Sequence, residues 1–152
     1  MRLLPHALIA LMLLTIGAGV AWRTTTARSE SKTRLTARES VIQLQQQIHL
    51  QAATLPSDGT RRFPESIEPE WFEDGVPRNA LLGAGHAWVE VDLEADINQE
   101  HPESPIAYDK THAEFWYNPL NGLIRARVPS GTSEARAVAT YNDVNETELD
   151  SF

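Results

Sequence analysis

The chain has 152 residues and a formal net charge of −8, from 21 acidic and 13 basic side chains, and it contains no cysteine. The absence of cysteine excludes disulfide frameworks, thiol nucleophiles and thiolate metal sites. The length fits one small domain with a stalk. The acidic C-terminal end argues against nucleic acid as a partner, because phosphate binding requires a basic surface.

The first predicted element is an apolar run from Leu3 to Trp22. At ~1.5 Å per residue, a helix of this length spans a hydrocarbon core of about 30 Å. We therefore expect residues 1–22 to form a membrane anchor. A cleaved signal peptide is the alternative, with Arg2 before the apolar stretch and the small residues Gly19-Val20-Ala21 as a cleavage site. Either element would place the rest of the chain outside the cytoplasm.

A basic cluster follows the apolar run directly, and it consists of Arg23, Arg28, Lys32, Arg34 and Arg38. Such a cluster suits a position against anionic lipid headgroups. We expect Trp22, Arg23 and Arg28 to mark the membrane interface, where indole rings are enriched. By the positive-inside rule, however, the same cluster favours a cytoplasmic location for the part of the chain that follows the apolar run.

Residues 23–55 predict an amphipathic helical stalk that continues the anchor. No proline or glycine occurs in this segment from Thr24 onward, and apolar residues recur at spacings of mainly three, four and seven: Leu35, Val41, Ile42, Leu44, Ile48, Ala52 and Leu55. This spacing is that of one helix face. We expect one helix from about residue 6 to residue 55, ~75 Å long if unbroken, whose apolar face packs on a globular head. Pro56 and Gly59 then end it.

The head is predicted at residues 56–141. The prolines of residues 60–85 indicate an irregular connection, and alternation predicts a strand at 88–93. The clearest local pattern is a β-hairpin, with strands at 114–117 and 123–128 around a turn that contains Asn121-Gly122. In this hairpin Arg125 and Arg127 fall on the exposed face. We expect an exposed loop at 95–110, a further strand at 135–141 and a frayed acidic tail at 142–152.

Together these elements predict an α+β fold, in which a long N-terminal helix, transmembrane in its first half, packs on a small antiparallel sheet of three to four strands. Trp71, Trp88 and Trp116 are expected in the core of the head, because aromatic side chains bury large areas.

This plan resembles that of type IV pilins and the pseudopilins of type II secretion. Residues 58–67, Asp-Gly-Thr-Arg-Arg-Phe-Pro-Glu-Ser-Ile, are similar to the G-x-Y/F-P-x-S-L stretch that follows the first helix of major pseudopilins. Residues 76–81, Val-Pro-Arg-Asn-Ala-Leu, look like the family's P-x-N/D-P/A-L connection. Residues 115–122, Phe-Trp-Tyr-Asn-Pro-Leu-Asn-Gly, are similar to the aromatic hairpin of many pilin-like heads.

The resemblance implies a non-enzymatic structural subunit or accessory protein of a type II secretion or type IV pilus-like apparatus. It would be a single-pass protein of the bacterial inner membrane with its head in the periplasm. Its partners would be other pilin-like subunits, secretion-apparatus proteins and the lipid bilayer. Arg34, Arg38 and Glu39 would then belong to the assembly helix. The alternative function is an anchored or secreted extracytoplasmic binding module that uses the aromatic and loop surface.

One departure from the family concerns the prepilin peptidase signature, Gly-Phe-Thr-Leu-x-Glu, which is cut after the glycine. With Ala7-Leu8-Ile9-Ala10 aligned on Thr-Leu-x-Glu, Pro5 stands at the glycine and Ala10 at the glutamate. In the family this glutamate pairs with the N-terminal amine of a neighbouring subunit, and an ion pair in lipid sets register because an unpaired charge there is costly. The chain therefore reads as a divergent, unprocessed relative.

No catalytic pattern occurs in the sequence. It has no HExxH motif, no Gly-x-Ser-x-Gly elbow and no phosphate-cradling glycine loop. We therefore expect no enzymatic activity, no cofactor and no metal site of the zinc type. Because some major pseudopilins bind calcium near a C-terminal loop, the resemblance makes calcium candidates of Asn142, Asp143, Asn145 and Glu146. A solvated tail is the alternative interpretation of these residues.

Overall fold

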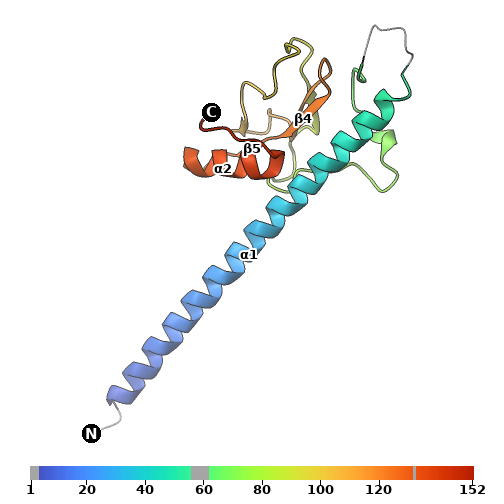
Figure 1. Ribbon diagram of the computed structural model, residues 1–152. Helices are drawn as coiled ribbons and strands as arrows, with labels where there is room; N and C mark the ends of the chain where they lie inside the picture. Colours follow the sequence, from blue (N-terminus) through green and yellow to red (C-terminus); the bar gives the residue numbers. More distant parts are fainter. Residues whose placement is uncertain (1–3, 56–61, 132) are drawn as a thin grey trace. The chain divides into compact units, whose positions relative to one another are not determined.

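The computed structural model describes residues 4–55, 62–131 and 133–152, with side chains from residue 27 onward. The chain divides into two compact units, Met1–Thr33 and Arg34–Phe152. The elements run in the order α1 (Leu4–Ala52), the short 3-10 helix η1 (Pro69–Trp71), β1 (Val89–Val91), β2 (Ile106–Ala107), β3 (Phe115–Asn118), β4 (Leu123–Ala126), β5 (Val128–Pro129) and α2 (Glu134–Asn145) (Figure 1).

The long N-terminal helix is confirmed, since α1 is assigned as one helix of 49 residues. The predicted anchor, residues 1–22, and the interface side chains Trp22 and Arg23 lie outside the residues whose side chains are described. Of the described residues, none belongs to a helix that is both long and apolar enough to cross a membrane.

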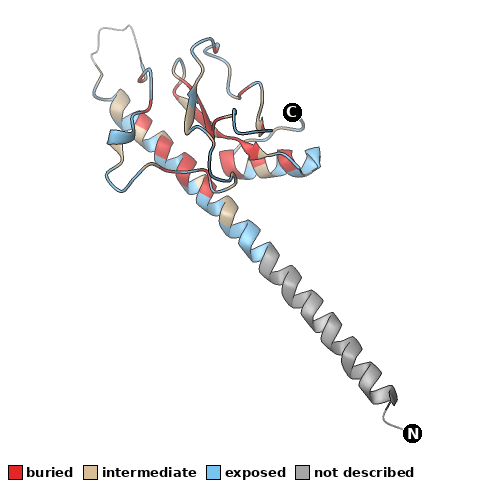
Figure 2. Cartoon of the chain, turned by 180° about the vertical axis from the view of Figure 1, so that it is seen from behind, coloured by how far each residue is buried: buried red, intermediate tan, exposed pale blue. Residues whose placement is uncertain are grey.

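The core of the second unit lies between the C-terminal part of α1 and one face of the sheet. Ala37, Val41, Leu44 and Ile48 recur every three or four residues along α1 and are almost fully buried (Figure 2). They pack against a cluster from β3, β4 and α2 made of Phe115, Tyr117, Ile124, Ala126 and Val144. The predicted apolar face is therefore correct in part. Leu35 and Ile42, which we assigned to it, are 57% and 40% exposed, because the buried stripe is centred on the opposite side of the helix.

The predicted hairpin is confirmed. Strands β3 and β4 pair antiparallel, from Phe115 with Ala126 to Asn118 with Leu123. Gly122 supplies a φ of +74° at the turn, and a Cβ at this position would collide with the ring of Phe63.

The prediction of a purely antiparallel sheet is wrong. The sheet has the order β1-β3-β4, and β1 runs parallel to β3, with Val89 opposite Phe115. Parallel neighbours need a long crossover connection, and residues 92–114 provide one. A second ladder, of β2 with β5, is also parallel. The predicted exposed loop at 95–110 is thus partly ordered and partly buried, since it contains β2 and the buried Ala95 and Ala107.

The strand predicted at 135–141 is also wrong, because these residues lie in α2. Alanine recurs at every second residue from 135 to 139 and suggests a strand, but Ala137, Tyr141 and Val144 bury one face of a helix at spacings of four and three. The tail is not frayed either. Leu149 packs on the cluster of Val128, Ala137 and Tyr141, and the Phe152 ring lies 5.5 Å from the Tyr141 ring.

Candidate functional site

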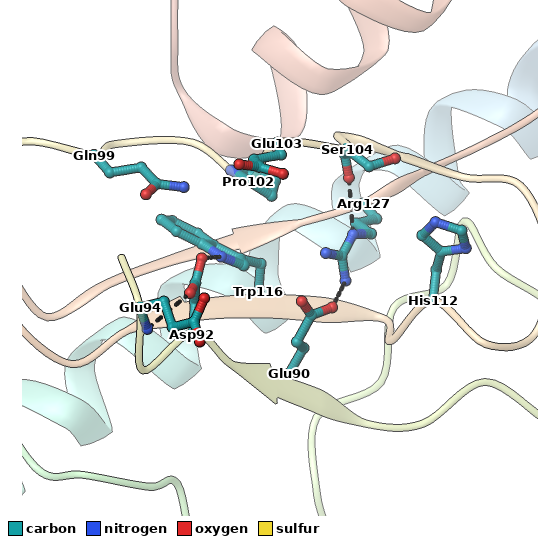
Figure 3. A pocket seen from close by; sticks show the side chains of 10 residues that line it. All are labelled: Glu90, Asp92, Glu94, Gln99, Pro102, Glu103, Ser104, His112, Trp116 and Arg127. Carbon is teal, nitrogen blue, oxygen red and sulfur yellow. Dashed lines mark hydrogen bonds and ion pairs between the residues drawn. The ribbon is translucent and has the colours of Figure 1, made fainter. Parts of the chain in front are cut away.

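A polar groove lies on the face of the sheet opposite α1. Because side chains alternate along a strand, Phe115 and Tyr117 face the helix and Trp116 faces the other way. The groove encloses about 400 Å³, a size within the range of about 300–1,000 Å³ that is typical of ligand clefts. Its main lining side chains are Trp116, Arg127 and four carboxylates, Glu90, Asp92, Glu94 and Glu103 (Figure 3).

Arg127 is the buried cation of the groove, with a side chain only 3% exposed. Its Nη1 lies 2.8 Å from Oε2 of Glu90 and 3.3 Å from the carbonyl oxygen of Ala113, and its Nε donates to the carbonyl of Ser104 at 2.9 Å. A buried charge needs such partners, because desolvation without them costs several kcal/mol. Arg127 thus ties β1 to two points of the crossover, Ser104 and Ala113. The expectation that it faces solvent is wrong.

Trp116 forms the floor of the groove and is 1% exposed. Its Nε1 donates to Oδ2 of Asp92 at 3.0 Å, and Oδ1 of Asp92 accepts the backbone N–H of Glu94 at 3.2 Å. The indole is therefore held by its polar edge as well as by packing. Trp71 and Trp88, which were also expected in the core, are only half-buried and pack against it, and Trp88 donates its Nε1–H to the carbonyl of Pro77.

The charges of the groove are unbalanced. Glu90 is paired with Arg127, and Asp92 accepts the Trp116 N–H. Glu94 and Glu103 are exposed, and neither makes a side-chain hydrogen bond or ion pair with any residue that the structure describes. Four carboxylates against one guanidinium make the groove an acidic surface, which attracts cations.

A tight turn at residues 109–112 lies beside the groove and presents His112 to it. Oδ1 of Asp109 accepts hydrogen bonds from the backbone N–H of Thr111, at 2.8 Å, and from the Thr111 hydroxyl. These bonds, together with the nearby His112 ring, lower the pKa of Asp109 to about 2. The carboxylate therefore stays ionised over the physiological range.

Two of the three residues predicted for the assembly helix have partners within the chain. Arg34 lies 3.9 Å from Asp143, and Arg38 pairs with Glu146. Glu39 is exposed and has no side-chain partner among the described residues. These ion pairs join α1 to the C-terminal end of α2, and as exposed pairs each contributes about 0–1 kcal/mol.

The calcium candidates do not converge on a common point. Asp143 and Glu146 face the two arginines of α1, whereas Asn145 is buried and bound to backbone. The side chain of Asn142 accepts the N–H of Leu149, which folds the tail back. Within the described ranges, no group of three or more histidine, aspartate or glutamate side chains is placed to hold a metal ion.

Asn145 has a structural role that the sequence did not indicate. Its Oδ1 accepts the N–H of Ala126 at 2.7 Å, and its Nδ2 donates to the carbonyl of Ala126 at 3.0 Å. Gln45 does the same further along β4, where it binds the Gly122 carbonyl and the Ile124 N–H. Two side-chain amides thus replace a neighbouring strand at the outer edge of β4. No local pattern could have revealed this, because each amide reaches a residue 19 or more positions away.

No protein-family model matches the chain, and no curated protein or solved structure is significantly similar to it. What the protein does must therefore be inferred from its own geometry and charge.

Proposed function

We propose that the protein is a non-enzymatic structural subunit of a bacterial envelope apparatus of the type II secretion or type IV pilus kind. It would be anchored in the inner membrane by residues 1–22, with its head in the periplasm. The observation that carries the proposal is α1, one helix of 49 residues that contains most of the apolar run Leu3–Trp22 and also contributes the central element of the head core.

The shared helix matters because a structural subunit must transmit force between its anchor and its head. Leu44 and Ile48 are fully buried beneath β3 and β4, and burial of each such side chain contributes about 1.5–3 kcal/mol. Gln45, from the same part of α1, binds the backbone of β4. The head therefore cannot separate from the end of the helix without losing its core.

The outer face of the helix offers a surface for neighbouring subunits. Leu35, Ile42 and Leu50 are 57%, 40% and 58% exposed, and they follow one another at spacings of seven and eight residues. At about 3.6 residues per turn they share one side of the helix, opposite the buried stripe. An apolar stripe of this kind suits lateral packing against a second helix.

Two measurements on the full chain, expressed in a Gram-negative host, test the proposal. Intact mass analysis of the membrane fraction is expected to find a species that begins at Met1 or formyl-Met1. Crosslinking in membranes is expected to yield multimers that weaken in the double variant Leu35→Ser/Ile42→Ser. The matched control is Tyr108→Ser, which removes a side chain 63% exposed on the head. A soluble species beginning at Trp22, without multimers, would overturn the proposal.

A second candidate is an extracytoplasmic binding module, and the groove over Trp116 is the observation that favours it. This candidate predicts a monomer whose melting temperature rises with a ligand, because binding to the folded state stabilises it by mass action. It also predicts no effect of substitutions in the exposed stripe of α1.

A further inference from the structure

The groove over Trp116 has two carboxylates available for a partner. Of its four acidic side chains, Glu90 and Asp92 are engaged by Arg127 and Trp116, whereas Glu94 and Glu103 have no partner in the described parts of the chain. Figure 3 shows Glu103 and Glu94 on opposite sides of the Trp116 ring. The groove therefore offers two carboxylates to a cation that enters it.

Exposed apolar side chains lie in the same segment of the chain as Glu94. Leu93 and Ile97, in the segment that follows β1, are 76% and 56% exposed. This segment is fixed to the hairpin turn, because Asn118 donates to the carbonyl of Asp96 at 2.8 Å and Asn121 donates to that of Ile97 at 3.0 Å. The acidic and apolar groups are thus displayed on an anchored segment, and their ordering costs little upon binding.

The chain itself contains a segment of complementary character. Residues 23–38 carry five basic side chains and one acidic side chain. Arg34 and Arg38 are engaged by the C-terminal end of the same chain, but Arg28 and Lys32 are exposed and have no side-chain partner in the part that the structure describes. Arg28 and Lys32 are four residues apart on a helix and so lie on one side of it. The exposed Leu35 follows three residues later in the sequence.

We propose that the groove over Trp116 binds the Arg28–Lys32 segment of a second copy of this chain, with Lys32 directed to Glu94 and Glu103. The inference rests on the proposed structural function and names the contact between its subunits. The two surfaces are different, so the contact is heterologous. It repeats from copy to copy and forms an open assembly unless the rotation between copies closes them into a ring. Paired charges that face each other at an interface fix its register and its choice of partner.

The absence of cysteine makes the contact directly testable by disulfide crosslinking. Two differently tagged full-length chains, one with Lys32→Cys and one with Glu94→Cys, are co-expressed in the same membranes and oxidised. We expect the mixed dimer at least fivefold above a control pair in which the second cysteine is Glu148→Cys. Glu148 is also an exposed carboxylate, but it lies in the C-terminal tail and does not line the groove.

Charge reversal provides the second test. Lys32→Glu or Glu94→Lys alone is expected to reduce crosslinking with a neutral bifunctional reagent, and the two changes together are expected to restore it. Neither Lys32 nor Glu94 makes a side-chain hydrogen bond or ion pair with the described residues, so the circular dichroism melting curves of these variants should match that of the parent protein. Crosslinking should also fall at ~1 M salt, where the Debye length is about 3 Å.

The outcomes separate the contact from the proposed function. Multimers that persist in every variant, with the disulfide between the cysteines at positions 32 and 94 no more abundant than the control disulfide, would overturn the contact and leave the structural function standing. If a single chain that carries both Lys32→Cys and Glu94→Cys forms this disulfide only within itself, and the mixed dimer does not form, the contact is also overturned. A complete lack of multimers in the unsubstituted protein would overturn both. Rescue by the double reversal, with the mixed dimer, establishes the contact.

Discussion

Replacement of Asn145 by leucine separates the two roles considered for this residue, a calcium ligand and an edge for β4. The change keeps the approximate size of the side chain and removes its amide. Ala126, whose N–H and carbonyl both bind that amide, is 0% exposed. Two buried backbone groups are therefore left without a partner, at about 1–3 kcal/mol each. We expect Asn145→Leu to lower the free energy of unfolding by about 2–5 kcal/mol.

Urea denaturation of the full chain in detergent, followed by tryptophan fluorescence, measures this loss. Asp143→Asn is the matched control, because it changes another calcium candidate whose one side-chain partner among the described residues is Arg34, at 3.9 Å. An exposed pair of this kind contributes about 0–1 kcal/mol, so the control should unfold close to the parent. The unfolding curves of the parent and of both variants are recorded with millimolar calcium and with a chelator, and we expect no difference between the two conditions.

Two results would refute this reasoning. A loss below about 1 kcal/mol in Asn145→Leu would show that water or a rearranged strand satisfies the Ala126 backbone. A calcium-dependent rise in stability of the parent, absent in both variants, would return these residues to the role of metal ligands, since a ligand that binds the folded state stabilises it.

Three further predictions concern the head. Gly122→Ala should destabilise it by more than about 1 kcal/mol, because φ is +74° and the new Cβ meets the ring of Phe63, and thermal unfolding measures this loss. Thr111→Val should raise the pKa of Asp109 from about 2 towards its ordinary value of 3.8, as followed by NMR titration of the carboxyl carbon. The contribution of Asp109 to folding stability is present above its ordinary pKa and is lost as the pH falls through its lowered pKa in the folded protein. Burial, and to a lesser extent the nearby charge of Arg125, lowers the pKa of His101 below its ordinary value of 6.5. The contribution of this histidine to folding stability is therefore full above pH 6.5 and is lost as the pH falls through the lowered pKa. His101→Gln should flatten the pH dependence of the melting temperature in this range, and an unchanged slope would contradict the assignment.

The elements with strong local signals were predictable from the sequence. Residues 24–55 lack helix breakers and carry an apolar period, and α1 ends at Ala52, close to the expected residue 55. The Asn121-Gly122 turn placed the hairpin correctly, because few residues adopt a positive φ without strain. The exposed side of α1 was harder to predict. Leu35, Val41 and Leu44 are all apolar, and only contact with the sheet decides which of them is buried.

The misassigned elements have a different cause, which is that tertiary contacts outweigh a weak local pattern. Residues 135–141 alternate like a strand, but α2 allows Tyr141 and Val144 to reach the core from one side. Asn145 and Arg127 read as surface residues because their types are usually exposed. Each is buried because its polar atoms meet backbone groups that are distant in the sequence, and a single sequence does not reveal such pairings.

The parallel pairing of β1 with β3 is also the origin of the candidate site. An antiparallel neighbour would be joined by a short turn, and the face of the sheet opposite α1 would then carry no covering segment. The parallel register instead requires the chain to return to the start of β3, and residues 92–114 do so across this face, where Asn118 holds them by the carbonyls of Asp96 and Gln99. The crossover supplies Glu94 and Glu103, the sheet supplies Trp116 and Glu90, and Arg127 binds the carbonyl of Ser104. A change that shortens the crossover should therefore abolish the groove and leave the packing of α1 on the opposite face intact, since that core depends on Phe115 and Tyr117 rather than on the returning segment.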